Sequence, residues 1–284
     1  MNPILISAEQ LQTIYNDPDT IILDASIEFQ IPGESPKVTG QMIPNAIQFD
    51  YDKDFCNRHT LLPHMFPSEK HFNERAQALG INNSSTIVIY DNAGTYASPR
   101  AWWMFKAMGH NKVLILDGGL PAWIKIGGAT TADYRVVTQD GDFSGTLEHG
   151  YFINAQQVLT HSNAQSANII DARSQARFDS KVPEPRKGLR SGHIPHSLCL
   201  PFASVLNDGH LKDTQDLKNI FNQLPLDESN PMIFSCGSGV TACILLVASY
   251  IAGYQNSMSI YDGSWTEWGA DSNLPIAVTQ NLSS

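Results

Sequence analysis

The sequence predicts an α/β protein built from two copies of one domain, each a mostly parallel sheet flanked by helices. The chain has 284 residues, which is about two domains at roughly 100–200 residues each. Its halves repeat the same elements in the same order: 26 residues separate Asp91 from Asp117, and 26 separate Cys236 from Asp262. A repeat this long indicates two copies of a domain rather than a solenoid.

Short apolar runs predict the strands of each copy. Continuous apolar runs are typical of strands that are buried on both faces of a parallel sheet. Helical patterns lie between them, most clearly at 99–110 and 239–253, and end at a His or a Gly. The runs are 21–25, 87–90 and 113–117 in the first half, and 168–172, 232–234 and 259–262 in the second.

Composition sets the domain limits and excludes several classes of function. We expect domains at 1–135 and 151–284, joined by a polar linker at 136–150. The net charge of −10 disfavours nucleic acid and anionic membranes as partners. The longest apolar stretch, 242–251, is shorter than the ~20 residues of a membrane span. The N-terminus lacks the basic start of a signal peptide, and no cysteine has the spacing of a metal site. We therefore expect reduced thiols, a cytoplasmic location and no metal.

The segment around Cys236 carries the predicted chemistry. An apolar strand ends at Ser235, a loop containing Gly237 and Gly239 follows, and a helix then begins. Both glycines permit the positive φ angles that turn backbone N–H groups inward. The helix N-terminus adds partial positive charge. Such a loop favours a thiolate nucleophile and would stabilise a persulfide anion.

A buried structural cysteine is the alternative interpretation of Cys236, and the glycine loop argues against it. Packing is the better interpretation for Cys243, which lies inside an apolar helix, and for Cys199; Cys56 receives no role. Residue 242 is Ala, whereas a cysteine-dependent phosphatase needs an Arg there to bind phosphate. The first half has Asp91 in place of Cys236, and a carboxylate cannot carry sulfur. We therefore expect the first domain to be catalytically silent.

Several motifs together resemble the rhodanese superfamily, and within it the mercaptopyruvate type of sulfurtransferase. They occur in the order of that family and cover nearly the whole chain. The resemblance implies two tandem rhodanese-like domains. Only the second domain carries the active-site cysteine. The motifs are FDYD at 49–52, PHMFP at 63–67, SPRAWWMF at 98–105, EPRKGLRSGHIP at 184–195, CGSGVTA at 236–242 and YDGSWTEWGA at 261–270.

The resemblance also assigns roles to individual residues. It implies that Arg177 and Arg186 bind the carboxylate and keto oxygens of an α-keto acid, which suits guanidinium groups. The alternatives are ion pairs of Arg177 with Asp179 and of Arg186 with Glu184. Arg190 is a weaker candidate, and a solvated loop residue is the favoured interpretation. The loop residues implied to bind substrate and persulfide are Gly237, Gly239, Val240 and Thr241.

A proton relay of Ser238, His64 and Asp52 is a further implication. Asp50 and Asp54 are alternatives to Asp52, and an interface histidine is the alternative for His64. The tryptophans and His193 are better explained by packing and structure than by substrate binding.

The resemblance implies transfer of sulfur from 3-mercaptopyruvate through a Cys236 persulfide to a thiol such as thioredoxin or to cyanide. No cofactor is implied. Thiosulfate sulfurtransferases resemble this chain but carry basic residues after the cysteine, where this chain has Gly237 and Ser238. A thiosulfate:cyanide sulfurtransferase and a non-catalytic sulfur-binding module are the alternative functions.

Overall fold

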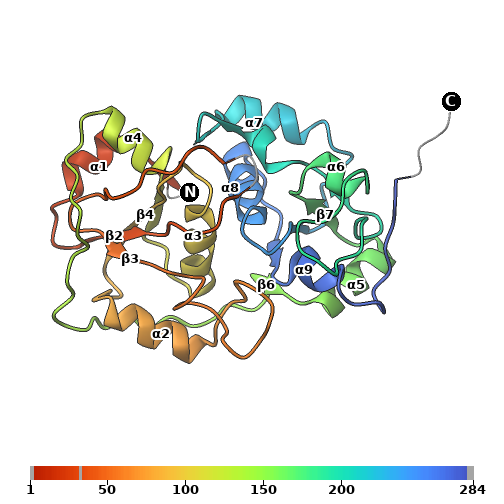
Figure 1. The fold of residues 1–284 in the computed structure, drawn as a ribbon, viewed down its shortest axis with the longest axis horizontal. Helices are drawn as coiled ribbons and strands as arrows, with labels where there is room; N and C mark the ends of the chain where they lie inside the picture. Colours follow the sequence, from red (N-terminus) through yellow and green to blue (C-terminus); the bar gives the residue numbers. More distant parts are fainter. Residues whose placement is uncertain (1–2, 32–33, 280–284) are drawn as a thin grey trace. The chain divides into compact units, whose positions relative to one another are not determined.

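The computed structural model describes residues 3–31 and 34–279 and contains two compact units, each with its own sheet (Figure 1). Among the described residues, unit 1 holds those up to His59, residues 66–149 and Leu206–Lys212. Unit 2 holds Thr60–Met65, Gly150–Val205 and residues 213–279. Each unit thus includes a short segment from the other half of the sequence. The domain limits 1–135 and 151–284 stay predictions.

Unit 1 is built on a five-stranded parallel sheet of order β1-β5-β4-β2-β3. Helices α1 and α4 pack on one face, around the buried side chains of Leu11, Leu120 and Trp123. The elements are β1 (Leu5–Ile6), α1 (Ala8–Ile14), β2 (Thr20–Asp24), β3 (Ile47–Gln48), α2 (Glu69–Ala78), β4 (Thr86–Tyr90), α3 (Ser98–Ala107), β5 (Val113–Leu116), α4 (Gly119–Lys125), and the antiparallel hairpin of β9 (Leu206–Asn207) and β10 (His210–Leu211).

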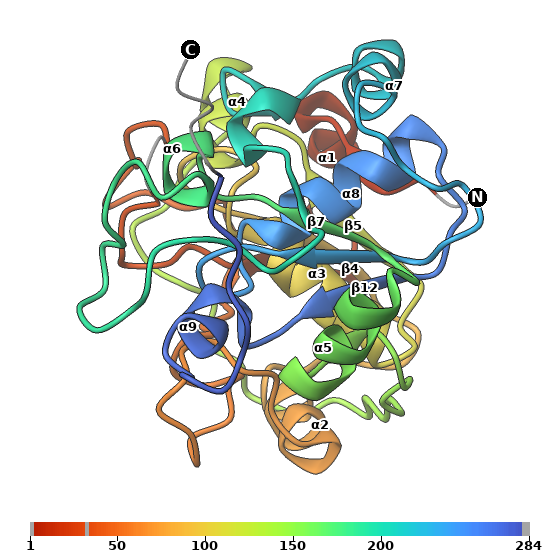
Figure 2. The ribbon, with the colours of Figure 1, turned by 90° about the vertical axis from the view of Figure 1, so that its right-hand side faces the viewer.

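Unit 2 repeats this topology with a parallel sheet of order β6-β12-β11-β7-β8. Figure 2 shows α5 and α9 on one side of this sheet and α7 and α8 on the other. The elements are β6 (Phe152–Ile153), α5 (Ala155–Ala164), β7 (Asn168–Asp171), α6 (Gln175–Phe178), β8 (Leu198–Cys199), the 3-10 helix η1 (Phe202–Val205), α7 (Thr214–Phe221), β11 (Met232–Ser235), α8 (Ala242–Ala252), β12 (Met258–Tyr261) and α9 (Ser264–Trp268).

The central strands have the burial that their sequences predict. Every residue of β2, β7 and β11 is buried, as expected for parallel strands covered on both faces. The prediction of two parallel sheets is therefore confirmed. The five tryptophans are buried as well, which confirms their role in packing.

The two predicted helices form, but their ends differ from the expectation in one case. Helix α8 ends at Ala252 and is capped by Gly253, whose φ of 97° is the left-handed conformation expected there. Helix α3 ends at Ala107, and the residue with left-handed φ is Gly109 rather than His110. His110 is buried instead, and its ring is hydrogen-bonded to the Ser85 carbonyl.

Of the residues expected as a linker, 136–149 belong to unit 1, and several of them contact α2. Gly141 donates its N–H to the carbonyl of Gln77, and Asn73 donates its side-chain amide to the carbonyl of Gly145. Phe143 is buried between the rings of Phe72 and Phe105. Within the described ranges, no helix has the length and apolar character needed to cross a membrane.

Candidate active site

Cys236 lies at the carboxyl end of a central strand of unit 2. Strand β11 pairs with β7 on one side and with β12 on the other. Cys236 follows it directly and is only 2 % exposed, and α8 begins six residues later at Ala242. This edge of a parallel sheet, between a strand end and a helix start, is the usual place for a ligand site in α/β proteins.

The loop after Cys236 directs a backbone donor at the sulfur. Gly239 donates its N–H to Cys236 Sγ over 3.2 Å, and its φ of +79° is the left-handed conformation that the sequence predicts. The same expectation for Gly237 is wrong, because its φ lies outside the left-handed range. A Cβ atom at 237 would lie 3.4 Å from Arg177 Nη2. A small residue therefore suits this position because Arg177 lies beside it.

Helix α9 holds the loop from beneath. Cys236 donates its N–H to Ser264 Oγ over 3.1 Å, and the Ser264 hydroxyl donates to the Tyr261 carbonyl. Trp265 donates its N–H to the Cys236 carbonyl over 3.0 Å. Ser264 is fully buried and has a φ of +49°, which is rare for a residue other than glycine. The sequence reasoning missed this contact, although the repeat has Gly119 at the matching position.

Arg177 reaches the loop from α6. Its Nε and Nη2 donate to the two carboxylate oxygens of Glu184, over 3.2 and 2.5 Å. The expected alternative, an ion pair with Asp179, is wrong: Asp179 pairs with Lys181 and accepts a bond from Thr279. Residues two apart on one helical turn do not face each other.

Arg186 approaches the same loop through a threonine of α9. Its Nη1 donates to Thr266 Oγ1 over 2.8 Å, and the Thr266 hydroxyl donates to the Gly237 carbonyl over 2.6 Å. The alternative of an ion pair with Glu184 is therefore wrong as well. Arg177 and Arg186 are thus both placed next to Gly237, as a site for a carboxylate would require.

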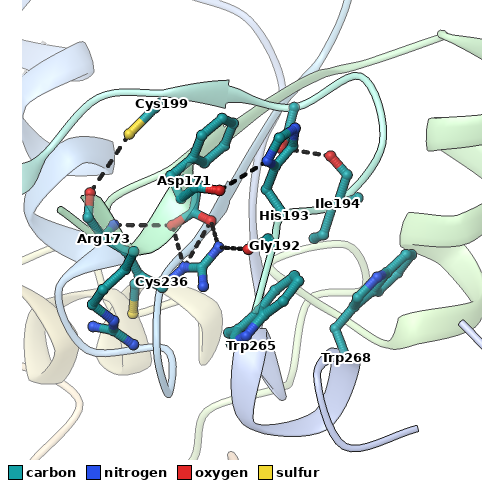
Figure 3. Close-up of polar contacts among 12 residues, drawn as sticks. Asp171, Arg173, Gly192, His193, Ile194, Cys199, Cys236, Trp265 and Trp268 are labelled. Atoms are coloured by element: carbon teal, nitrogen blue, oxygen red, sulfur yellow. Dashed lines mark hydrogen bonds and ion pairs between the residues drawn. The ribbon is translucent and has the colours of Figure 1, made fainter. Parts of the chain in front are cut away.

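A buried charge network supports Arg177, and the sequence reasoning missed it. Arg173 donates to both carboxylate oxygens of Asp171 and to the Gly192 carbonyl (Figure 3). It also donates to Glu184 Oε1 over 2.9 Å. Its guanidinium also lies 4.1 Å from the ring centre of Trp265. Burial opposes its charge, but Asp171 and Glu184 raise the pKa of Arg173 above its ordinary value. Glu184 is therefore shared by two arginines.

The structure brings only part of the proposed relay into one unit. Ser238 is 8 % exposed and lies in the Cys236 loop, and His64 is buried in the segment Thr60–Met65 of the same unit. Asp52 belongs to unit 1, where its N–H donates to Asp50 Oδ1. The relay therefore stays a prediction.

Two of the other cysteines, Cys199 and Cys56, lie in surroundings that favour the neutral thiol. Burial raises the pKa of Cys199 to about 12, and burial also raises the pKa of Cys56. Cys243 is fully buried in α8, and its thiol donates to the Gly239 carbonyl over 3.4 Å. All four cysteines are free. Among them, Cys236 has the backbone N–H directed at its sulfur.

Arg190 and His193 have structural roles. Arg190 is not a solvated loop residue, because its guanidinium donates to carbonyls at the C-terminal end of α9, including those of Trp268 and Gly269. Such contacts stabilise the C-terminus of a helix. The ring of His193 stacks on Phe178 and is hydrogen-bonded to its carbonyl, which confirms the structural interpretation.

Comparisons with known proteins agree with this site. The model of the rhodanese-like domain matches residues 7–126 and 154–271. The chain is 37% identical to thiosulfate/3-mercaptopyruvate sulfurtransferase 1, mitochondrial, of Arabidopsis thaliana, covering 98% of this chain and 79% of that protein. It is 36% identical to the 3-mercaptopyruvate sulfurtransferase of Escherichia coli K12, covering 95% and 96%. The crystal structure of a 3-mercaptopyruvate sulfotransferase from Escherichia coli superposes with a TM-score of 0.81 at 33% identity, covering 93% of this chain and 99% of that one.

Proposed function

The chain belongs to the rhodanese family, and on that premise we propose that it transfers sulfur from 3-mercaptopyruvate through a persulfide on Cys236. The observation that carries the role of Cys236 is the Gly239 N–H, which lies 3.2 Å from its sulfur in a loop between a strand and a helix. Because an N–H donor stabilises a sulfur anion, this loop suits both the thiolate and the persulfide.

The first half-reaction loads the cysteine. The Cys236 thiolate attacks the sulfur of the donor, an S–S bond forms, and the C–S bond of the donor breaks. Its electron pair leaves as the enolate of pyruvate, which takes a proton from the Ser238 hydroxyl or from water. The relay of Ser238 with His64 and Asp52 would return that proton. The products are pyruvate and the Cys236 persulfide.

The arginines orient the donor. In our proposal, Arg177 and Arg186 hold its carboxylate and keto oxygens, while the backbone of Gly237, Gly239, Val240 and Thr241 surrounds the transferred sulfur. This is supported by the position of Arg177 Nη2, which is 3.4 Å from where a Cβ of residue 237 would lie. Holding a planar keto acid between two guanidinium groups fixes its sulfur in front of the nucleophile.

The second half-reaction empties the cysteine. A thiolate acceptor, such as that of thioredoxin, or cyanide attacks the outer sulfur, the S–S bond breaks, and the Cys236 thiolate is restored. We propose that this acceptor is met in a reducing, cytoplasmic compartment, which fits four free cysteines.

The charge of the site favours mercaptopyruvate over thiosulfate. Arg173 and Arg177 are balanced by Asp171 and Glu184. Among the described residues around the loop, Arg186 then supplies the charge that no acid balances, which suits a singly charged carboxylate better than a dianion. Thiosulfate transfer is the second candidate, because the name of the Arabidopsis relative includes both donors.

Steady-state kinetics with both donors tests the proposal. We expect kcat/KM for mercaptopyruvate to exceed that for thiosulfate by orders of magnitude, and we expect pyruvate to be released in step with sulfur transfer. A wild type that prefers thiosulfate would make the second candidate correct. A stable persulfide without turnover on either donor would indicate a sulfur-binding module instead.

A further inference from the structure

Thr266 joins the substrate-binding region to the loop of the nucleophile. Its hydroxyl donates to the Gly237 carbonyl over 2.6 Å and accepts a hydrogen bond from Arg186 Nη1 over 2.8 Å. A hydroxyl has one proton to donate. Because that proton is directed at Gly237, the oxygen is left to accept from the guanidinium, and the donor and acceptor roles are fixed.

Arg186 needs such a partner because its surroundings do little else to hold it. It is exposed, whereas Arg177 is held by both carboxylate oxygens of the buried Glu184. A long exposed side chain loses rotamer freedom when it is held in one conformation. A pre-existing hydrogen bond to the guanidinium reduces what substrate binding must still supply.

We propose that Thr266 is a positioning residue for the donor: it orients Arg186 toward the substrate beside Gly237. This inference rests on the proposed function, since it assigns Arg186 to the substrate carboxylate or keto group. Thr266 acts through Arg186 and does not touch the reacting atoms. Its expected signature is therefore a change in KM rather than in kcat.

The backbone makes this role separable from a structural one. Thr266 also donates its own N–H to the Gly237 carbonyl, over 2.9 Å. In Thr266→Val that bond remains, so the carbonyl keeps a donor and the loop keeps its support. The substitution replaces the hydroxyl with a methyl group, at nearly constant volume.

The test is a kinetic cycle of Thr266→Val and Arg186→Gln. We expect Thr266→Val to raise KM for mercaptopyruvate about tenfold, the lower range for a hydrogen bond to a charged group, with kcat within about twofold. In the Arg186→Gln background the same change should alter KM less than about twofold, because the two residues act as one unit. Inhibition by pyruvate, which reports binding without chemistry, should weaken by the same factor.

Two further variants keep the result interpretable. Thr266→Ser restores the hydroxyl and should return KM to within about twofold of wild type. Thr160→Val is the matched control, because the Thr160 hydroxyl also donates to a backbone carbonyl, that of Gln156 on α5. It should leave KM unchanged.

The outcomes distinguish this inference from the proposed function. A wild type that forms no persulfide and does not turn over would contradict the proposed function itself. An active wild type whose KM is unaffected by Thr266→Val would contradict the role of Thr266 alone. Equal effects of Thr266→Val with and without Arg186 would contradict it too, because they would mean that Thr266 acts on the loop.

Discussion

The Asp91 loop of unit 1 and the Cys236 loop of unit 2 leave the same position in two sheets of the same strand order. In unit 1 the Asp91 carboxylate accepts six hydrogen bonds. The donors are the backbone N–H groups of Ala93, Gly94, Tyr96, Ala97 and Ser98 and the hydroxyl of Ser98. Burial raises the pKa of Asp91, while the bonds from Ser98, Ala97 and Tyr96 oppose that change.

This comparison indicates that the loop binds an anion in both units. A carboxylate oxygen is two bonds from Cβ, and so is the outer sulfur of a cysteine persulfide. Asp91 Oδ2, which accepts from the N–H groups at the start of α3, therefore marks where the outer sulfur would lie at the start of α8. The fold supplies an anion-binding loop twice. In unit 1 the anion is part of the chain, and in unit 2 it is the transferred group.

The Asp91 loop of unit 1 is also covered by other parts of the chain. The hairpin of β9 and β10 covers the Asp91 loop: Thr95 donates its N–H to the Gly209 carbonyl over 2.8 Å, and a Cβ on Gly94 would lie 2.8 Å from Gly209 Cα. Asp117 fixes the hairpin through the Leu211 N–H and His210. Backbone therefore fills the space that a substrate would need.

The largest expected effect is the loss of the sulfur carrier. Incubation with mercaptopyruvate without an acceptor should add one sulfur, about 32 Da, to the wild type in intact mass spectrometry. Cys236→Ser should show neither the added mass nor turnover. Cys199→Ala is the control and should keep both, because Cys199 has a raised pKa and stays a thiol. Sulfur found on another cysteine would contradict the role of Cys236 as the sulfur carrier.

The next effect tests the filled loop of unit 1. Asp91→Ala leaves the backbone donors and the Ser98 hydroxyl without their buried acceptor, and should lower the free energy of unfolding of unit 1 by about 3–5 kcal/mol. Urea unfolding at constant pH measures this. Cys236→Ala should cost less, because its sulfur has one such contact among those described. A larger loss for Cys236→Ala would mean that the two loops do not hold anions in the same way.

The smallest expected effect concerns the charge network that unit 2 has and the described residues of unit 1 lack. Its members follow from the residue two positions after the matching aspartates of β2 and β7. Asp24 is bonded to the Ser26 N–H and to the Tyr134 hydroxyl, whereas Asp171 is bonded to Arg173. Glu184→Gln weakens the support of Arg177, and we expect KM for mercaptopyruvate to rise about tenfold. Tyr134→Phe removes a hydrogen bond to the matching aspartate of unit 1, Asp24, and should leave KM unchanged. Equal kinetics for both variants would exclude a role for the network in donor binding.

The repeated sheets and the nucleophile loop could be predicted from the sequence because their signals are local. Buried parallel strands are continuous apolar runs. A glycine loop between such a run and a helix can be recognised from the sequence alone, without knowing which residues its members contact. The left-handed φ of Gly239 agreed with that interpretation. Gly237 did not agree with it. A small residue is needed there because Arg177 lies close by, not because the backbone has a left-handed φ.

The partners of the charged residues could not be predicted. Arg177 has Asp179 and Glu184 within seven residues, and sequence distance favours the first. In the structure Arg177 pairs with Glu184. Helix α6 is a single turn, and the chain that follows it brings Glu184 back beside Arg177. The exchange of Leu206–Lys212 into unit 1 was also missed, because tertiary packing determines which unit a short hairpin packs on.

That hairpin has a consequence for synthesis of the chain on the ribosome. Domains of a growing chain generally fold from the N-terminus, at about 5–20 residues added per second. All five strands of the first sheet are translated by Leu116, yet the hairpin that covers the Asp91 loop ends at Leu211. For the interval between them, the emerging first sheet keeps an uncovered loop edge. The Thr95 N–H gains its acceptor only when Gly209 has been translated.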